Sequence, residues 1–548
     1  MPAAMRQWMY ISIPGILLGA LLFAASLSPS LVPRPPTVQG LVSGVALAAG
    51  YAIGALLRWL WGYLELPELR GRNARIVTSA AATVCAVIAL TFLWRASTWQ
   101  NAIRALMDLE PVDGTRPFVV ALIAVLVFGA LLAAGKVFRM TIALLARWLE
   151  RYVPRRVSRV CGLLAAAFLF WSLIDGVLFH AALRSADASY SQVDALMDDD
   201  VSIPADPLKP GGPGSLLAWK DLGRAGRRFV ASGPSAKELS EFLGTSAPEP
   251  IRVYVGLNCA ATIEARARLA LEELVRVGGF ERSVLIVVTP TGTGWIDPKA
   301  LDTVEYLHRG DIASVAVQYS YLPSPLSLIA EPHYGVETAV ALFREIYGHW
   351  RQLPADRRPR LYLHGLSLGA LNSTLSFDIL DVLSQPFQGA LWSGPPFRSG
   401  LWRTLTARRN PDSPAWLPRV GDGSIVRFTN QENHLAAPTP WGVTRIIFLQ
   451  YASDPITFFE PAALYREPAW MAEPRGPDVS PQLRWYPIVT MLQLAADMVA
   501  GDVAPEGYGH DYAPEDYIDA WLALTDPPSW SGEEIERLKA HYARVRRH

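Results

Sequence analysis

A short apolar segment that ends in a glycine-flanked serine constrains the fold of this chain more than any other feature. Residues 360–369 read Arg-Leu-Tyr-Leu-His-Gly-Leu-Ser-Leu-Gly, and a helical pattern begins at Ala370. A strand, a tight turn and a helix in this order are what a nucleophile elbow requires. The two flanking residues, Gly365 and Gly369, leave room for neighbouring backbone. The segment therefore predicts Ser367 as a nucleophile that stands exposed at the carboxyl edge of a sheet.

Hydrophobicity is distributed unevenly along the 548 residues, and this indicates two parts. The first 180 residues or so are very apolar, whereas the remainder has the mixed composition of a soluble domain. The chain carries no net charge and no basic patch interleaved with aromatic residues, so nothing favours nucleic acid as a partner. Cys85, Cys161 and Cys259 are too far apart in sequence to form a metal motif. We expect Cys85 and Cys161, which lie in apolar stretches, to be embedded in lipid or packed, and all three to act as small hydrophobic side chains.

Five stretches of the amino-terminal part are long and apolar enough to cross a bilayer as helices. They are approximately Ile11–Leu31, Val38–Leu60, Ile76–Phe92, Val119–Val137 and Cys161–Phe179. The first resembles a signal peptide, but its apolar run is long and no small-x-small cleavage site precedes a soluble domain. We therefore expect an uncleaved helix and a bundle of about five transmembrane helices.

The distribution of arginines predicts how these helices are oriented. The link after the second stretch and the link after the fourth are rich in Arg and Lys, whereas the two links of opposite parity hold few. We expect the basic links and the amino terminus to be cytoplasmic, and everything after about Ala182 to be extracytoplasmic. Met140–Tyr152 is an amphipathic segment that we expect along the inner interface; if it spans instead, the topology inverts.

The remaining sequence predicts a linker followed by an α/β domain. Residues 202–215 are dense in Pro and Gly and read as a linker or surface loop. Beyond them strand-like and helix-like patterns alternate, which is typical of a mostly parallel sheet with helices on both faces. The predicted domains are residues 1–182 (transmembrane), 183–235 (linker and entry segment) and 236–548 (catalytic). Residues 394–444 form a long excursion that could be either a lid or a surface insertion.

A serine nucleophile needs a base and an acid to orient that base, and in α/β-hydrolases these follow the serine in the order acid, then histidine. Asp454 comes directly after the strand-like run Arg445–Tyr451. His510 lies farther on in a glycine-bearing loop, Tyr508-Gly-His-Asp-Tyr. Chain order, spacing and local context therefore predict Asp454 and His510 as the partners of Ser367.

Other titratable residues fit the roles of base and acid less well. His434 is the main rival base, but it precedes Asp454 in sequence. Asp378 and Asp381 lie on the predicted helix after the serine and would point away from it, and His364 is expected to be a packing residue. Asp175, inside the fifth apolar stretch, is either a functional intramembrane acid or a helix-packing residue near the outer end.

The oxyanion of the reaction also needs two hydrogen-bond donors. The amide of Leu368, which follows the nucleophile, is the first predicted donor. The second is expected in the loop Thr291–Trp295, at Thr293 or Gly294, because this loop follows an earlier strand; an ordinary glycine-rich turn is the alternative.

Together these residues resemble the α/β-hydrolase superfamily. The multi-span region with its segment Ser26-Leu-Ser-Pro-Ser-Leu-Val-Pro-Arg34 makes the chain similar to a bacterial family of membrane-anchored α/β-hydrolases. The resemblance implies a Ser-Asp-His triad, matching Ser367, Asp454 and His510, and a place in the bacterial inner membrane. The chain departs from the superfamily pattern in having no clear final strand between Asp454 and His510.

Three functions are consistent with the sequence. The leading hypothesis is a serine hydrolase of esters or thioesters, with a lipid or lipid-linked substrate suggested by the membrane anchor and with no metal or organic cofactor. An acyltransferase of envelope lipids or glycans would use the same residues, with an alcohol in place of water. A non-enzymatic membrane scaffold or transport component with an inert hydrolase fold is the third.

Overall fold

The computed structural model describes residues 12–67, 71–114, 116–330, 333–500, 503–528 and 530–545. Contacts divide the chain into two compact units. The first comprises the described residues of Met1–His180 together with Phe459–Pro505, and the second comprises Ala181–Phe458 together with Glu506–His548. Residues 459–505 belong by sequence to the range expected for the catalytic domain, yet they pack with the amino-terminal helices.

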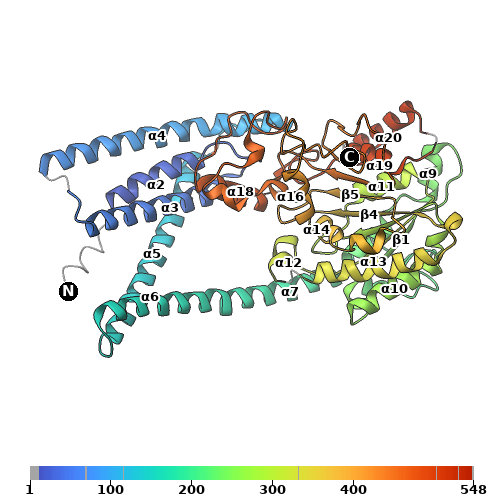
Figure 1. The fold of residues 1–548 in the computed structure, drawn as a ribbon, viewed down its shortest axis with the longest axis horizontal. Helices are drawn as coiled ribbons and strands as arrows, with labels where there is room; N and C mark the ends of the chain where they lie inside the picture. The colour runs from blue at the N-terminus through green and yellow to red at the C-terminus, as the bar shows by residue number, and fades with distance from the viewer. Residues whose placement is uncertain are drawn as a thin grey trace. The chain divides into compact units, whose positions relative to one another are not determined.

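The first unit is built from long apolar helices (Figure 1). Its amino-terminal elements are α2 (Ile13–Ser26), α3 (Pro36–Tyr63), α4 (Gly71–Leu106), α5 (Pro117–Leu149), α6 (Arg155–Trp171) and the π-helical turn η1 (Ser172–Phe179). Within the described residues, four helices are long and apolar enough to cross a membrane: α3, α4, α5 and the segment Arg155–Gly176. The predicted apolar bundle is therefore present with four such helices, whereas α2, which corresponds to the first predicted stretch, has only 14 residues.

Two helix boundaries in this unit differ from the prediction. The first apolar stretch was expected to remain helical to Leu31, but α2 ends at Ser26. Pro29 and Pro33 explain this, because a proline lacks the amide that a helix interior needs and disfavours helical backbone in the residue before it. The segment Met140–Tyr152 was expected as a separate interfacial helix, but α5 continues without a break to Leu149.

The insertion Phe459–Pro505 contributes the last helix of the first unit. It contains the short 3-10 turns η6 (Pro461–Leu464) and η7 (Ala469–Met471) and then α18 (Val489–Val499). Val489 of α18 packs against Ala25 of α2 and Ala46 of α3 in a buried apolar cluster. The helix also supplies Asp497, whose side chain is fully buried against Arg34. Both apolar contact and ion pairing therefore tie the insertion to α2, α3 and the loop between them.

The second unit contains a seven-stranded sheet in which every neighbouring pair of strands is parallel (Figure 1). Its strands are β1 (Ile251–Val255), β2 (Val284–Thr289), β3 (Ile312–Val317), β4 (Arg360–Leu366), β5 (Gly389–Ser393), β6 (Val426–Thr429) and β7 (Arg445–Leu449), in the order β1-β3-β2-β4-β5-β7-β6. β1, β2, β3 and β5 are buried at every residue, as expected for strands covered on both faces.

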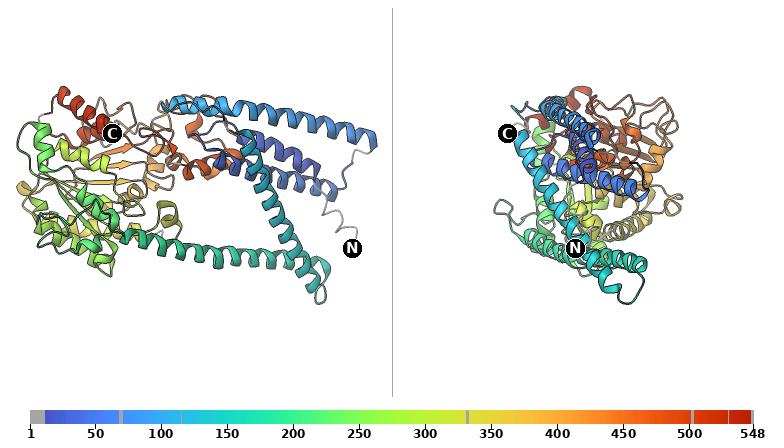
Figure 2. Two further views of the ribbon diagram at one scale, coloured as in Figure 1. Left: turned by 180° about the vertical axis from the view of Figure 1, so that it is seen from behind. Right: turned by 90° about the vertical axis from the view of Figure 1, so that its left-hand side faces the viewer.

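Helices cover both faces of this sheet (Figures 1 and 2). One face carries α10 (Ile263–Arg276), α13 (Tyr334–Gln352) and α14 (Leu368–Thr374), and the other carries α11 (Pro298–Leu307) and α19 (Pro514–Thr525). The remaining helices of the unit are α7 (His180–Ala195), α8 (Gly223–Ala231), α9 (Ala236–Leu243), α12 (Ser324–Ala330), α15 (Ile379–Val382), α16 (Gly400–Ala407), α17 (Pro455–Phe458) and α20 (Gly532–Val545). Short 3-10 turns lie at Trp219–Leu222, Leu257–Cys259, Gly279–Glu281 and Ala355–Arg357.

Strand register brings four chain segments together at the carboxyl edge of the sheet. Thr289 at the end of β2 lies beside Gly365 of β4. On the other side, Leu366 pairs with Ser393 at the end of β5, and Ser393 in turn pairs with Leu449 at the end of β7. The residues that follow these strands, Pro290, Ser367, Gly394 and Gln450, therefore emerge next to one another. Ligand and catalytic sites of open parallel sheets lie at this edge.

Candidate active site

Ser367 occupies a sharp turn between β4 and α14. Its backbone angles, φ 56° and ψ −124°, lie in a region that a residue with a side chain rarely adopts. Two hydrogen bonds hold it there: the Ser367 amide donates to the carbonyl of Ser393 (3.0 Å), and the Leu371 amide donates to the carbonyl of Ser367 (3.1 Å). The predicted strand, turn and helix are thus found, but Ser367 is only 5 % exposed rather than standing open to solvent.

The two glycines of the pentapeptide are required by close backbone packing. A Cβ on Gly365 would collide with the backbone of Gly369 and Ala370 one turn ahead. A Cβ on Gly369 would collide with the carbonyl oxygen of Thr289 at the end of β2. Side-chain-free positions at 365 and 369 therefore allow α14 to lie directly against β2 and β4, which fixes where Ser367 points.

Asp454 is a fully buried carboxylate just beyond β7. It accepts hydrogen bonds from His510 Nδ1 (2.7 Å), the Tyr512 hydroxyl (2.7 Å), the Ile456 amide (2.8 Å) and the Thr457 hydroxyl (3.0 Å). Burial alone would raise its pKa, but the facing His510 and these donors outweigh it and hold the pKa of Asp454 below its usual value. Asp454 is therefore ionised, and His510 must present an N–H to it from Nδ1.

His510 keeps its second ring nitrogen free. Among the described residues, Nε2 is buried and has no hydrogen-bond partner. The ring packs directly against Gly394, where a Cβ would collide with the imidazole Cε1. Gly394 follows Ser393, whose carbonyl accepts the Ser367 amide, so the imidazole sits against the segment that positions the elbow. No hydrogen bond joins Ser367 to His510 in this part of the chain, which is common in unliganded sites.

The loop that carries His510 is fixed by contacts on three sides. The Gly509 amide donates to the Ser453 hydroxyl (2.9 Å), and Gln431 Nε2 donates to the carbonyl of Gly507 (3.1 Å). Lys299, in the first turn of α11, pairs with Glu506 (3.3 Å) and with Asp511 beside the histidine. These contacts hold the loop in place although no strand precedes His510 in the described residues.

The predicted oxyanion loop forms a tight turn after β2. The Thr291 amide donates to the carbonyl of Trp295 (2.9 Å), and the Gly294 amide donates to the carbonyl of Thr291 (3.0 Å). Gly294 has φ +81° and its carbonyl accepts from the Tyr254 hydroxyl (2.8 Å), so this glycine serves the turn itself. In the described chain, the Thr293 amide has no partner. The Leu368 amide opens α14, where first-turn amides lack helical acceptors.

The other titratable residues of interest in the sequence do not join the Ser367, Asp454 and His510 arrangement. His434 pairs with Glu432 (3.3 Å) and is partly exposed, and Asp378 is exposed and caps the Leu380 amide. His364 is buried: burial lowers its pKa to about 4, and its Nδ1 contacts the carbonyl of Leu391 (2.9 Å). The backbone carbonyl of Asp175 lies 2.5 Å from His180 Nδ1. The side chain of Asp381 is outside the described residues.

Three contributors to the site were not predicted. Tyr512 and Thr457 both donate to Asp454, and Lys299 pairs with Asp511 in the loop that carries His510. Tyr512 lies two residues after His510, and Thr457 lies three residues after Asp454. This closeness in sequence is the only feature that could have indicated their contact with Asp454. Lys299 is more than two hundred residues from its partners and carries no such signal.

The parallel sheet, the strained Ser367 directly after the central strand β4 and the pair formed by Asp454 and His510 together define an α/β-hydrolase fold. A family model described as "Alpha/beta-hydrolase family" matches residues 251–538, and one described as "Alpha/beta-hydrolase family N-terminus" matches residues 27–234. The first covers more than half of the chain, so the chain belongs to this α/β-hydrolase family. No curated protein and no solved structure gives a significant match.

Proposed function

We propose that the chain is a membrane-anchored serine hydrolase that cleaves ester or thioester bonds. The observation that carries this is the pairing of ionised Asp454 with His510 Nδ1, which leaves Nε2 free at the edge of the sheet where Ser367 emerges. The strained backbone of Ser367 supports it, because such strain persists at sites where the surrounding structure enforces it for function.

In the proposed reaction, His510 Nε2 takes the hydroxyl proton of Ser367 as its oxygen attacks the substrate carbonyl. Asp454 stabilises the imidazolium that forms and keeps the ring in the required tautomer. The amides of Leu368 and Thr293 bind the oxyanion, and His510 then protonates the leaving alcohol or thiol. A water molecule, deprotonated by the same nitrogen, hydrolyses the acyl-enzyme, releases the acid and regenerates Ser367.

A lipid or lipid-linked ester is the proposed substrate class. The support is the location of the site on a chain whose first unit has four helices able to cross a membrane. Such an anchor keeps the catalytic domain at a bilayer surface, where acyl esters are abundant.

We also propose that the catalytic domain is extracytoplasmic in a bacterial inner membrane. The links between α3 and α4 and between α5 and α6 are arginine-rich, which favours the cytoplasmic side for both. Because α5 is continuous to Leu149, the segment Met140–Tyr152 adds no further crossing. Protease added to intact spheroplasts should therefore digest the catalytic domain; protection until the membrane is permeabilised would reverse the orientation.

Acyl-ester turnover by the full-length protein in detergent tests the proposed chemistry. We expect release of free acid from nitrophenyl butyrate or nitrophenyl palmitate by the wild-type protein and no release by Ser367→Ala. Added alcohols should not divert the acyl group to new esters. Predominant ester formation would instead make the protein an acyltransferase, and unchanged turnover in Ser367→Ala would remove Ser367 from the reaction.

A further inference from the structure

The first unit contains a cavity of about 190 Å³ between the loop after α2 and the helices α4 and α5. Most of its wall is hydrocarbon, supplied by aliphatic side chains and by a run of prolines; among these are Leu27, Leu93, Ala96, Pro117 and Val120. Four polar residues also line it: Arg34, Gln39, Gln100 and Arg104. The ligand that the cavity can bind depends on which of these four residues have hydrogen-bonding groups that the protein leaves unused.

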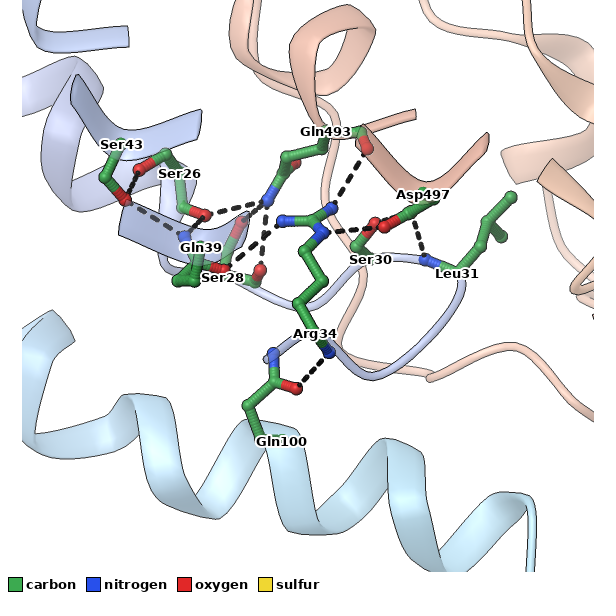
Figure 3. A network of polar contacts seen from close by, with 10 residues as sticks. All are labelled: Ser26, Ser28, Ser30, Leu31, Arg34, Gln39, Ser43, Gln100, Gln493 and Asp497. Atoms are coloured by element: carbon green, nitrogen blue, oxygen red, sulfur yellow. Dashed lines mark hydrogen bonds and ion pairs between the residues drawn. The ribbon is translucent and has the colours of Figure 1, made fainter. Parts of the chain in front are cut away.

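Arg34 and Gln39 are engaged in a buried network, and the side chain of Arg34 is inaccessible to solvent (Figure 3). Arg34 Nε pairs with Asp497 (2.6 Å), its Nη1 donates to Gln39 Oε1 (3.3 Å), and its Nη2 donates to the carbonyl of Gln493 (3.2 Å). Gln39 Nε2 in turn donates to the carbonyl of Ser26 (2.9 Å). The charge of Arg34 is therefore balanced inside the protein.

Gln100 presents an unused donor. Its side-chain oxygen accepts the backbone amide of Arg34 (3.0 Å), and because an amide can only donate, the oxygen assignment is fixed by chemistry (Figure 3). The Nε2 group must then point elsewhere, and within the described residues it has no partner. Gln100 is only 6 % exposed, so bulk water offers little compensation for this donor.

Arg104 adds an unpaired positive charge on the same helix, four residues after Gln100. Its Nε donates to the carbonyl of Glu110 (2.5 Å), and no carboxylate lies within ion-pair distance among the described residues. The two terminal nitrogens make no hydrogen bond in that part of the chain. The free polar groups of the cavity are therefore all donors, and one of them is cationic.

We propose that this cavity binds an anionic amphiphile, with its hydrocarbon chain along the apolar wall and its acidic headgroup on Arg104 and Gln100. The helices α4 and α5, which line the cavity, also carry exposed apolar side chains: Leu90, Trp94 and Phe118 are 66 %, 87 % and 89 % exposed. Such surfaces are suited to contact with lipid chains. A free fatty acid and an anionic phospholipid share this chemistry. The inference does not depend on the proposed catalytic activity.

Photo-crosslinking of the full-length protein tests the inference. The Ser367→Ala variant in phosphatidylcholine nanodiscs is irradiated with a diazirine analogue of palmitic acid, and labelled peptides are located by mass spectrometry. We expect label on the carboxyl-terminal half of α4 and on the start of α5. Competition by palmitate alone assigns a fatty acid, and competition by phosphatidylglycerol alone assigns a phospholipid. Equal competition by hexadecanol, which is uncharged, would overturn the anionic headgroup.

Matched variants test the two donors. Gln100→Leu and Arg104→Met should each weaken competition by palmitate roughly tenfold, as expected for loss of a hydrogen bond to a charged group. Arg95→Met removes an exposed cation from the same helix outside the cavity and should have no effect. Ala96→Phe, which fills the cavity, should abolish labelling of this site. Unchanged labelling in Ala96→Phe would refute the site. Equal losses in Arg95→Met and Arg104→Met would also refute it, and these two exchanges are matched in size and charge.

Discussion

Asp454→Asn is expected to slow acylation of Ser367 by about 10⁴-fold, the size of loss seen when the acid of a serine triad is replaced by its amide. The substitution keeps the size of the side chain, and the asparagine oxygen can still accept from the Ile456 amide at the Oδ1 position. Its NH₂ group would face His510 Nδ1, however, and this favours the tautomer with the proton on Nε2. A protonated Nε2 cannot take the proton of Ser367.

The rate of covalent labelling by a fluorophosphonate measures this effect directly. Asp378→Asn is the matched control, because Asp378 is an exposed acid on the segment after α14 and should leave the rate unchanged. Comparable slowing in both variants would mean that loss of negative charge, rather than the position of Asp454, matters. A wild-type rate in Asp454→Asn would exclude this residue as the partner of His510.

Arg34→Met is expected to destabilise the first unit by about 3–5 kcal/mol, the usual consequence of removing one partner from a buried ion pair. The side chains of Arg34 and Asp497 are both completely inaccessible to solvent. Without Arg34, Asp497 keeps the Ser30 hydroxyl and the Leu31 amide as donors, but its charge is uncompensated. The loss should appear as a lower melting temperature of the detergent-solubilised protein.

A second substitution separates charge burial from packing. Arg34→Met/Asp497→Leu removes both charges, so it should recover a large part of the lost stability. Arg419→Met breaks the exposed pair with Asp412 and should change the melting temperature little, since surface pairs contribute little. If Arg34→Met melted like the wild-type protein, the network of Figure 3 would not hold α18 to the loop after α2.

The strands of the sheet could be predicted where hydrophobic patterns were strong. β1, β2, β3, β4, β5 and β7 each overlap a strand-like run of the sequence, because strands buried on both faces are continuous apolar segments. In chain order these runs are Ile251–Leu257, Val284–Val288, Ala313–Tyr319, Arg360–Leu363, Gly389–Trp392 and Arg445–Tyr451. β6 (Val-Arg-Phe-Thr) was missed, since it is a four-residue edge strand whose first two residues are only half buried. It lies in the long excursion after β5, part of which therefore extends the sheet.

Packing between segments that are distant in sequence could not be predicted from local sequence patterns. The run Ile488–Val499 predicted a helix, found as α18, but no local pattern indicated that it packs on α2 and α3. Asp497, a single acid in that run, finds its partner more than four hundred residues away in Arg34. The same holds for the candidate site. Ser367, Asp454 and His510 could be predicted from their order along the chain and their local sequence context. The contacts of Lys299 and the free amide of Thr293 could not, because they depend on the three-dimensional arrangement of loops.

The central claim is that Ser367 is an activated nucleophile. Labelling of the folded, full-length protein with a fluorophosphonate probe tests it most directly, because such probes react with a serine only when a base and an oxyanion site activate it. The account predicts stoichiometric labelling of the wild-type protein at Ser367 and none of Ser367→Ala. Absence of labelling in well-folded wild-type protein, or equal labelling of Ser367→Ala, would contradict it.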